Sequence, residues 1–335
     1  MTRAVWRIGV DGVDITARLR PHFVSLELSD SRGHEADDLT MQFADPKGDL
    51  DLPAAGTSLR FHLGVEGPDG RTLFDKGLFH IDEIGHSGPP DRLEIKAAAA
   101  DFTQGLKVRR DASWSEATIG QIVGEVAARH GLARAIDDRF ADYGIDHVTQ
   151  SNESDMNLLS RLAREHGGFF TVKNGFVIFS SEAEGKTPSG RPLPPAALDR
   201  GQTSSYRFTQ TSREPKFSGV RAAWNDMGKG EKSWVEVGDG NRVKRLQGVF
   251  PTQDKARAAA AAEYRRLSRA VVAFQADLSS GRPDIIPETP LRLSGFVQAA
   301  QPIDWIVNAA AHSVDSGGGI TTRIDAEARS ETDDP

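Results

Sequence analysis

The sequence contains no cysteine in its 335 residues. Disulfide bonds and thiolate metal sites are therefore excluded, and the composition is typical of a protein that folds in a reducing cytoplasm. The N-terminal residues lack the apolar core of a signal peptide, and no apolar run approaches the roughly 20 residues needed to cross a bilayer. We therefore expect a soluble protein without a membrane anchor, stabilised by packing or by oligomerisation.

The sequence also lacks a surplus of positive charge. It has 41 Lys and Arg against 48 Asp and Glu, which gives a formal net charge of −7. A protein that clamps nucleic acid non-specifically needs a basic surface that releases counterions, so this role is disfavoured. A passive acidic wall close to DNA remains compatible with the charge.

Motifs for metal and cofactor binding are missing as well. The nine histidines form no His-Glu-x-x-His motif or comparable cluster, so we predict no metal site. His130 and His166 each precede a glycine, and we interpret them as helix caps whose charged form is favoured by the helix dipole. Gly228-Lys229-Gly230 lacks the strand-loop-helix spacing of a phosphate loop and reads as a hairpin tip, so no cofactor is expected.

What the sequence does contain is a long series of short alternating segments, with 33 Gly and 17 Pro between them. Residues 4–16 predict a hairpin, because alternating apolar positions flank the turn pair Asp11-Gly12. Further strands are expected at residues 23–28, 39–43, 59–65, 77–86 and 93–98. Strands at this spacing without helices predict an antiparallel barrel or sandwich, which we place at residues 1–105.

The pattern becomes helical in the next part of the chain. Apolar residues recur at helical spacing over 119–127, and a second helix is expected near 153–166. A hairpin follows over 169–179, so residues 106–181 predict a small α+β insert domain. The polar stretch 182–204 reads as a linker or exposed loop.

Strand signals resume at Tyr206 and continue almost to the end of the chain. One helix, expected over 252–269, has a face of small residues that could lie close against a sheet. The other segments expected to be strands are residues 217–224, 234–237, 243–249, 270–278, 289–295, 305–314 and 320–328. Residues 205–330 therefore predict a second barrel, followed by a disordered acidic tail at 331–335. The fold class is mainly β, with two antiparallel barrel-like domains and the insert.

Parts of the two predicted barrels resemble each other. Leu59-Arg60-Phe61 after a proline matches Leu291-Arg292-Leu293 after a proline, and the two prolines are 234 residues apart. A second match pairs the segments that contain His86 and His312, which are 226 residues apart. The matches are short, so they predict a shared barrel architecture and leave open whether the two domains arose by duplication.

The most distinctive stretch lies around the second predicted helix. Asn152 or a neighbouring serine can cap the helix, Glu153 and Asp155 suit the positive end of its dipole, and Gly167 ends it. Its buried stripe is expected to comprise Met156, Leu158, Leu159 and Leu162. Glu153 and Asp155 would point in different directions from a helix, and no nucleophile accompanies them, so we interpret them as structural and not as a catalytic pair.

This stretch resembles the signature of a known family. The residues that carry the resemblance are Gln150, Glu153, Ser154, Asp155, Leu159, Arg161, Leu162 and Gly167. They are similar to a motif of the late-control-protein-D tail hubs of contractile phages and of the related VgrG spike proteins of type VI secretion. The resemblance extends over nearly the whole chain.

The resemblance implies a structural protein with no enzymatic activity. It implies a homotrimeric hub that joins the sixfold tail tube to the threefold spike and lines a channel through which DNA passes without specific binding. The expected partners are further copies of the chain, the tail tube protein, the spike protein and other baseplate proteins. Such a protein is made in the cytoplasm of the host bacterium and ends in the baseplate of the virion. VgrG proteins carry fused spike domains, whereas this chain ends at the second barrel, so a separate spike is expected.

Two other functions were compatible with a chain rich in strands. A tail-associated peptidoglycan hydrolase is disfavoured because no carboxylate or metal constellation is present. A carbohydrate-binding β module would need exposed aromatic residues, but Trp224, Trp234 and Trp305 fall in predicted strands and are better interpreted as core or interface residues. For a ring of alternating barrels, we expect contacts between residues 1–105 of one chain and 205–330 of the next, and a neutral or acidic channel wall.

Overall fold

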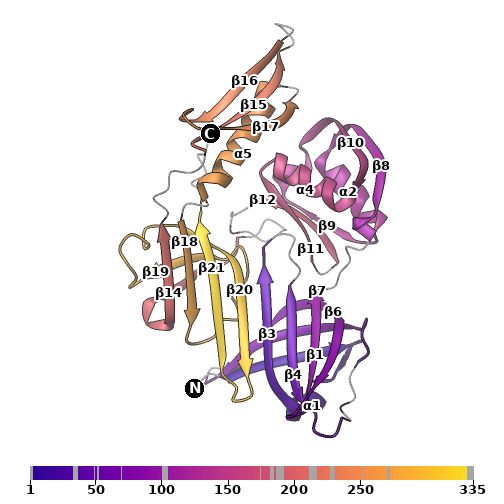
Figure 1. The fold of residues 1–335 in the computed structure, drawn as a ribbon, viewed down its shortest axis with the longest axis vertical. Coiled ribbons are helices and arrows are strands. Elements are labelled where there is room, and N and C mark those ends of the chain that lie inside the picture. Colours follow the sequence, from indigo (N-terminus) through magenta and orange to yellow (C-terminus); the bar gives the residue numbers. More distant parts are fainter. Residues whose placement is uncertain are drawn as a thin grey trace.

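The described part of the chain, in a computed structural model, consists of residues 3–32, 37–48, 50, 53–68, 70–99, 105–173, 175–181, 185, 192–210, 217–226, 231–250, 252–269 and 272–329. The expected acidic tail and the expected hairpin tip at residues 228–230 lie outside these residues. The fold is mainly β. Figure 1 shows two lobes side by side, with a helical insert above one lobe and a small peripheral unit above the other.

The first lobe contains the first seven strands of a large, mostly antiparallel sheet. They are β1 (Arg3–Val10), β2 (Val13–Asp14), β3 (Phe23–Ser31), β4 (Asp38–Ala44), β5 (Ser58–Gly67), β6 (Gly70–Ser87) and β7 (Arg92–Ala99). Two short helical turns, α1 (Thr16–Leu19) and η1 (Arg20–His22), precede β3. Asp11 and Gly12 have φ angles of 50° and 81° between β1 and β2, as a type I′ turn requires, so the predicted hairpin is confirmed.

The sheet of the first lobe curls around one hydrophobic core. Its largest fully buried side chains include Ile8, Leu19, Leu26, Leu28, Phe43, Phe61 and Phe79. The backbone N–H of Ala4 in β1 donates to the carbonyl of Gly318 at 2.9 Å, and Val314 and Ile320 enter the same core. The first strand of the chain therefore closes against the hairpin formed by its last two strands.

The second lobe continues the same sheet around a core of its own. Its strands are β13 (Ala196–Asp199), β14 (Thr203–Gln210), β18 (Val272–Leu278), β19 (Pro290–Ser294), β20 (Trp305–Asp315) and β21 (Ile320–Ala328), and η3 (Arg200–Gln202) precedes β14. Phe274 and Trp305 are almost fully buried at its centre. The strand β13 pairs with β19 although it lies within the range 182–204 that was expected to be a linker. That part of the expectation is wrong, since alternation over four residues was too short to recognise.

One strand pairing joins the two lobes into a single sheet of 13 strands. The strand β20 of the second lobe runs antiparallel to β3 of the first, from the pair Ala309 and Ser31 to the pair Asp315 and Ser25. The main path of the sheet is β14-β18-β21-β20-β3-β4-β7-β6-β5-β1-β2. The lobes are therefore held by a continuous hydrogen-bonded ladder as well as by packing.

The helical insert follows β7 and has a separate core. Its elements are η2 (Gly105–Lys107), β8 (Arg109–Thr118), α2 (Ile119–Arg129), β9 (Ala133–Ile136), α3 (Asp138–Ala141), β10 (Gly144–Ser154), α4 (Asp155–Glu165), β11 (Gly168–Lys173) and β12 (Phe176–Ser181). Thr118 and Gln121 form a capping box at the start of α2. The predicted helices and the hairpin after them are confirmed.

The peripheral unit corrects the prediction of one continuous second barrel over 205–330. The strands β15 (Gly219–Asp226), β16 (Glu231–Gly238) and β17 (Val243–Phe250) form their own sheet, covered by α5 (Gln253–Arg269). Ala256 and Ala260 of α5 are fully buried against this sheet, so the expected packing of its small-residue face is confirmed. Alternating strands of a separate unit look the same in sequence as strands of the surrounding lobe, and the boundary was therefore missed.

The two lobes share one strand plan. In chain order, β3, β4, β5, β6 and β7 correspond to β14, β18, β19, β20 and β21, and the corresponding strands have the same neighbours. The register also agrees: His86 lies opposite Leu93 as His312 lies opposite Thr322. These are the residues matched in the sequence, so the predicted likeness between the two halves is confirmed.

The agreement extends to irregular positions. The ladder of β6 and β7 is interrupted between Ile81 and Glu83, and that of β20 and β21 between Val307 and Ala309, each 226 residues later. The ladders of β3 with β4 and of β14 with β18 also shift at corresponding positions, after Phe23 and after Thr203. Because bulges are specific local features, their shared positions show that the two lobes correspond in detail and not only in the order of their strands.

Candidate functional site

The residues that carry the family resemblance lie around the point where β10 leads into α4. Ser154 is the residue that caps α4, and its hydroxyl accepts the N–H of Asn157 at 3.2 Å. Glu153 belongs to β10 and not to the first turn of the helix, which corrects the sequence interpretation. The reason is a register shift after Gln150, within which Asn152 adopts φ 45° and the strand continues to Ser154. This bulge depends on pairing with β8, which the local pattern does not reveal.

Asp155 is the centre of a buried polar network. Its carboxylate is fully buried and accepts hydrogen bonds from Arg129 Nη1 at 2.9 Å, His130 Nε2 at 2.8 Å and Gln150 Nε2 at 2.8 Å. Arg110 Nε lies 3.2 Å from Oδ2, the oxygen that His130 also contacts. Burial alone would raise the pKa of Asp155, but the hydrogen bonds from His130, Gln150 and Arg129 outweigh it and lower the pKa. The carboxylate is therefore held ionised, and it ties β8, the end of α2 and β10 to the start of α4.

Glu153 and Arg161 form a second, separate pair. Arg161 donates from Nη2 to Glu153 Oε2 at 2.7 Å and from Nε to Oε1 at 3.2 Å, and it also reaches the carbonyl of Thr149 at 3.1 Å. The bidentate geometry fixes the strand before the helix to the middle of the helix. The two acidic residues that the sequence placed on one helix thus serve different contacts.

The apolar part of the motif lies in the core of the insert. Leu158, Leu159 and Leu162 are fully buried, while Met156 is partly buried against the same core. Gly167 follows α4 with φ 71°, the left-handed conformation expected of it. The structure therefore gives each of the eight motif residues a contact or a conformation within the insert.

His130 and His166 cap α2 and α4 as predicted, but their surroundings differ. His130 binds the Asp155 carboxylate. His166 lies against the ring of Tyr143, with the two centroids 4.5 Å apart, and burial lowers the pKa of His166 to about 4. The expectation of a charged imidazole is wrong for His166, because desolvation outweighs the helix dipole.

The described residues contain no group of three or more His, Asp or Glu side chains that could hold a metal ion. The same part of the chain has no helix long and apolar enough to span a bilayer. In the Asp155 network, the carboxylate accepts hydrogen bonds from arginine, histidine and glutamine donors. This arrangement joins the strand β10, the end of α2 and the start of α4 through one buried carboxylate.

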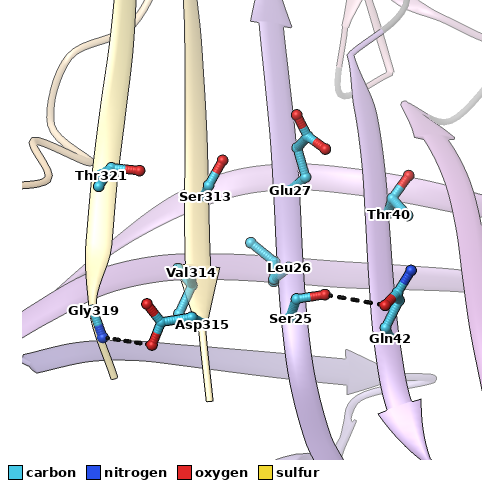
Figure 2. Close-up of a pocket in the computed structure, with 10 residues that line it drawn as sticks. All are labelled: Ser25, Leu26, Glu27, Thr40, Gln42, Ser313, Val314, Asp315, Gly319 and Thr321. Atoms are coloured by element: carbon cyan, nitrogen blue, oxygen red, sulfur yellow. Dashed lines mark hydrogen bonds between the residues drawn. The ribbon is translucent and has the colours of Figure 1, made fainter. Parts of the chain in front are cut away.

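The second candidate site is a polar sheet face that crosses the joint between the lobes. Successive strand partners form one row across it: Thr321, Ser313, Glu27, Thr40, Lys96 and Glu83. Figure 2 shows the first four of these on β21, β20, β3 and β4, with Leu26 and Val314 pointing to the other side. We call this side the polar face. It is defined by the residues that point away from the two lobe cores on β14, β18, β21, β20, β3, β4, β7 and the end of β6.

The polar face has an acidic surplus. Its acidic residues are Glu27, Asp38, Glu83, Glu94, Asp277, Asp315, Asp325 and Glu327, and its basic residues are Arg92, Lys96, Arg207 and Arg323. The remaining positions are mostly Ser, Thr, Gln and Ala. A hollow of about 300 Å³ lies on this face at the joint, lined by Ser25, Glu27, Gln42 and Asp315 among others. This face contains none of the motif residues, and its only signal in the sequence is the alternation of polar residues in the predicted strands.

A cluster of charges holds the insert on the joint. Lys173 of β11 donates to Asp30 Oδ1 at 2.8 Å and to Asp37 Oδ1 at 3.0 Å. Burial and the nearby Asp30 charge raise the pKa of Asp37 to about 7. Close by, Lys76 of β6 lies 3.4 Å from Nε2 of His312. Burial lowers the pKa of His312 to about 3, so the ring is neutral and can accept from the lysine while its Nδ1–H donates to Thr322.

Comparison with known proteins decides the family. The model of the phage tail baseplate hub (GPD) family matches residues 40–318. The chain belongs to this family. The probable baseplate hub protein of Escherichia phage 186 is 31% identical over 94% of this chain and 90% of its own length. The family predicted from the motif is confirmed, and with it the function of a baseplate hub in a phage tail.

Solved structures with the same fold come from phages and from secretion systems. The 43 kDa tail protein of prophage MuSo2 from Shewanella oneidensis matches with a TM-score of 0.68 and 16% identity, over 97% of this chain and 98% of its own. The E. coli c3393 protein, a component of the type VI secretion system, matches with a TM-score of 0.59 and 13% identity, over 97% of this chain and 77% of its own. The hub fold is thus shared with a secretion component, as the likeness to VgrG proteins predicted.

Proposed function

We propose that this hub protein acts as a homotrimer whose two lobes alternate around a threefold axis and close a ring of six similar units. The observation that carries the proposal is the shared strand plan of the lobes, which includes the register and the bulges. Two similar units per chain allow three chains to present nearly sixfold symmetry on one side and threefold symmetry on the other. Such a ring can adapt a sixfold tail tube to a threefold spike.

The lobes fit this task as barrel-like ring units. We assign the ring to the domains predicted at 1–105 and 205–330, with β13 added to the second and the peripheral unit excluded from it. The insert at 106–181 lies outside the polar face and is anchored on the joint through Lys173. In this proposal the eight motif residues keep the insert rigid and have no catalytic part.

The polar face is the surface that we assign to the channel. Its acidic surplus and its many uncharged side chains give DNA no favourable counterion release on contact. A polyanion can then pass along the wall without being held. The same features explain why a negatively charged protein suits a position around DNA.

The partners and the location follow from the adaptor role. We expect contacts with the tail tube protein on one side of the ring, the spike protein on the other, and further baseplate proteins around it. The protein is made in the host bacterial cytoplasm and acts in the tail baseplate of the virion. We propose that it catalyses no reaction, because the motif residues are engaged in structural contacts.

The mass of the purified protein in solution tests this proposal. A species of three times the chain mass of 36.3 kDa that forms rings in electron micrographs is the expected result. Lobes stacked along the axis, instead of alternating around it, would contradict the proposal. A monomer that binds or cleaves peptidoglycan would instead support one of the two functions disfavoured by the sequence.

A further inference from the structure

The sheet of the peripheral unit has one face that α5 covers and one that points away from it. Helix α5 packs on the side of Val220, Ala222 and Val235. The residues of the other parity in each strand point to the opposite side, which we call the outer face. Its charged and large side chains are Arg221, Lys232, Trp234, Glu236, Arg245 and Val249. The unit lies outside the 13-stranded sheet and at one end of the molecule in Figure 1, so its outer face is placed to meet another protein.

Trp234 lies at the centre of the outer face, with two arginines over its ring. The guanidinium carbon of Arg221 is 4.6 Å from the ring centroid, and that of Arg245 is 5.4 Å from it. Trp234 belongs to β16 and Arg245 to β17, so the indole reaches across the central strand β15. Ala223 of β15 lies directly opposite Trp234 and is buried although it points to the outer face. The indole itself remains 40% exposed.

The positions of the two arginines do not favour the sheet itself. Arg221 and Arg245 lie directly opposite each other on β15 and β17, and like charges in such pairs are destabilising. Glu236 lies opposite Arg221 on β16, but its carboxylate lies beside Gly240. Among the described residues, no carboxylate forms an ion pair with either guanidinium. Because local rules of this kind are broken mainly at functional sites, the pair indicates a place for an anion from outside the chain.

A bulge brings an exposed apolar side chain beside the same ring. After the pair of Arg221 and Arg245, a regular ladder would place Gln247 opposite Ala223. The register shifts, and Val249 takes this position, next to Trp234 on the other side of Ala223. Val249 is 38% exposed. Bulges often direct side chains towards a site, and this one combines two cations, an indole and an apolar side chain on one face.

The chemistry of these groups defines what the outer face can bind. A guanidinium that lies over a ring uses its flat side, and its N–H donors at the edge stay available to a carboxylate. We propose that the outer face binds an acidic segment of another baseplate protein, with its carboxylates on Arg221 and Arg245 and an apolar side chain on Trp234 and Val249. Tryptophan and arginine are also the residues that most often dominate the energy of protein interfaces. This contact does not depend on the proposed ring, and it gives the expected baseplate partners a site.

Charge complementarity favours an acidic protein segment over DNA. The chain carries a net charge of −7, whereas the outer face has three basic residues, Arg221, Lys232 and Arg245, against Glu236. A DNA site is a basic track that follows successive phosphates, and a carboxylate within it costs affinity. The outer face instead combines its basic groups with Glu236, an indole and Val249, a mixture that matches a peptide carrying both carboxylates and apolar side chains.

Photo-cross-linking in assembled particles tests this contact. Lys232 lies two residues before Trp234 on the outer face, so Lys232→p-benzoylphenylalanine places the cross-linker there and keeps Trp234 and both arginines. We expect a discrete adduct with a peptide of another protein that is rich in Asp and Glu. Adding Arg221→Gln with Arg245→Gln should reduce the adduct at least about tenfold, because charge-assisted hydrogen bonds are lost. The matched control adds Arg164→Gln with Arg257→Gln, two exposed arginines on α4 and α5, and should keep the adduct.

The remaining outcomes also decide the proposal. An adduct with DNA would assign the outer face to phosphate, and a peptide without carboxylates or an adduct that persists in the Arg221 and Arg245 variant would overturn acidic recognition. Particles that contain the hub but give no adduct would overturn the docking site. Circular dichroism of the purified variants shows whether they fold. A folded Arg221 and Arg245 variant that is missing from particles, while the control enters them, supports the contact, whereas equal loss of both overturns it.

Discussion

At the scale of single residues, Asp155 joins several segments of the insert through its carboxylate. The carboxylate is fully buried and is reached by two arginines, a histidine and a glutamine. Breaking a buried ion pair by removing one partner leaves the other charges without compensation. The cost of losing Asp155 should therefore exceed that of losing Glu153, whose partner Arg161 is 35% exposed.

We predict that Asp155→Asn lowers the free energy of unfolding by about 3 kcal/mol, because the arginines lose their counter-charge. Glu153→Gln is the control and should lower it by less than about 1 kcal/mol, as expected for a partly exposed pair. Urea unfolding followed by circular dichroism measures both values. Equal effects of the two substitutions would argue against a central role for Asp155.

A pH effect is expected from His166, whose pKa is lowered to about 4 by burial. In the unfolded chain His166 binds a proton near pH 6.5, whereas in the folded chain it remains neutral down to about pH 4. The stability that goes with a neutral, buried His166 is therefore fully present above pH 6.5 and is lost as the pH falls towards 4. The loss is at most about 1.4 kcal/mol per pH unit. His312, with a pKa of about 3, acts in the same direction, whereas Asp37, with a pKa of about 7, acts in the opposite direction.

The His166 contribution can be isolated by His166→Gln. Urea unfolding at pH 7 and pH 5 should show the wild type losing more stability on acidification than the variant does. The difference arises because glutamine does not titrate, while the effects of His312 and Asp37 are common to both proteins. The same loss in both proteins would show that His166 is not held neutral.

At the scale of elements, the sequence predicted whether a segment forms a helix or a strand better than it predicted how these elements are arranged in space. Alternation and turn residues located most of the described strands, but β8, β9, β10 and β13 were not predicted. The cap and the closing Gly167 located α4. The start of that helix was misplaced because the bulge at Asn152 exists only through pairing with β8. The peripheral unit was missed for a related reason, since strand patterns do not say which sheet a strand joins.

The peripheral unit should be removable. It is inserted between β14 and β18, and these two strands are paired with Gln210 opposite Val272, so the chain leaves and re-enters the lobe at adjacent positions. Removing the unit would break the ion pair between Lys255 and Asp146 of the insert. The Asp146 side chain is 66% exposed, so this pair contributes less than about 1 kcal/mol to stability. We predict that replacing residues 211–271 by a short Gly-Ser turn preserves the fold and the oligomeric state.

Circular dichroism and the mass in solution check this deletion. A matched variant in which residues 32–37, the corresponding connection between β3 and β4, are replaced should behave differently. That replacement removes Asp37 and with it a partner of Lys173, so the insert loses an anchor. Unfolding of the first variant would show that the peripheral unit contributes to the lobe.

At the scale of the whole molecule, the repeat was visible in sequence only as two short matches. Its extent could not be predicted, because equivalent positions are mostly different residues that share a register, such as Leu93 and Thr322 opposite the two histidines. The joint of the lobes was also hidden, since β20 and β3 lie at opposite ends of the chain. The proposed channel wall remains a prediction that began from the net charge, and the acidic surplus of the polar face is compatible with it.

The charge of the polar face gives the last prediction. Glu27→Lys, Thr40→Lys and Ser313→Lys replace three neighbours of one row, so each chain gains four positive charge units on the wall. If the polar face lines the channel, DNA should now bind at low salt, with an affinity that falls steeply as salt rises because counterions are released. Fluorescence anisotropy with a short duplex measures this affinity, and the wild type should show no binding under the same conditions.

The control places the same charge change at exposed residues of the insert, with Glu116→Lys, Asn152→Lys and Ser151→Lys. This control should bind DNA without slowing the release of DNA from particles. Slower DNA release by the wall variant alone is the expected result, and equal release by both variants would show that the polar face does not line the path of DNA.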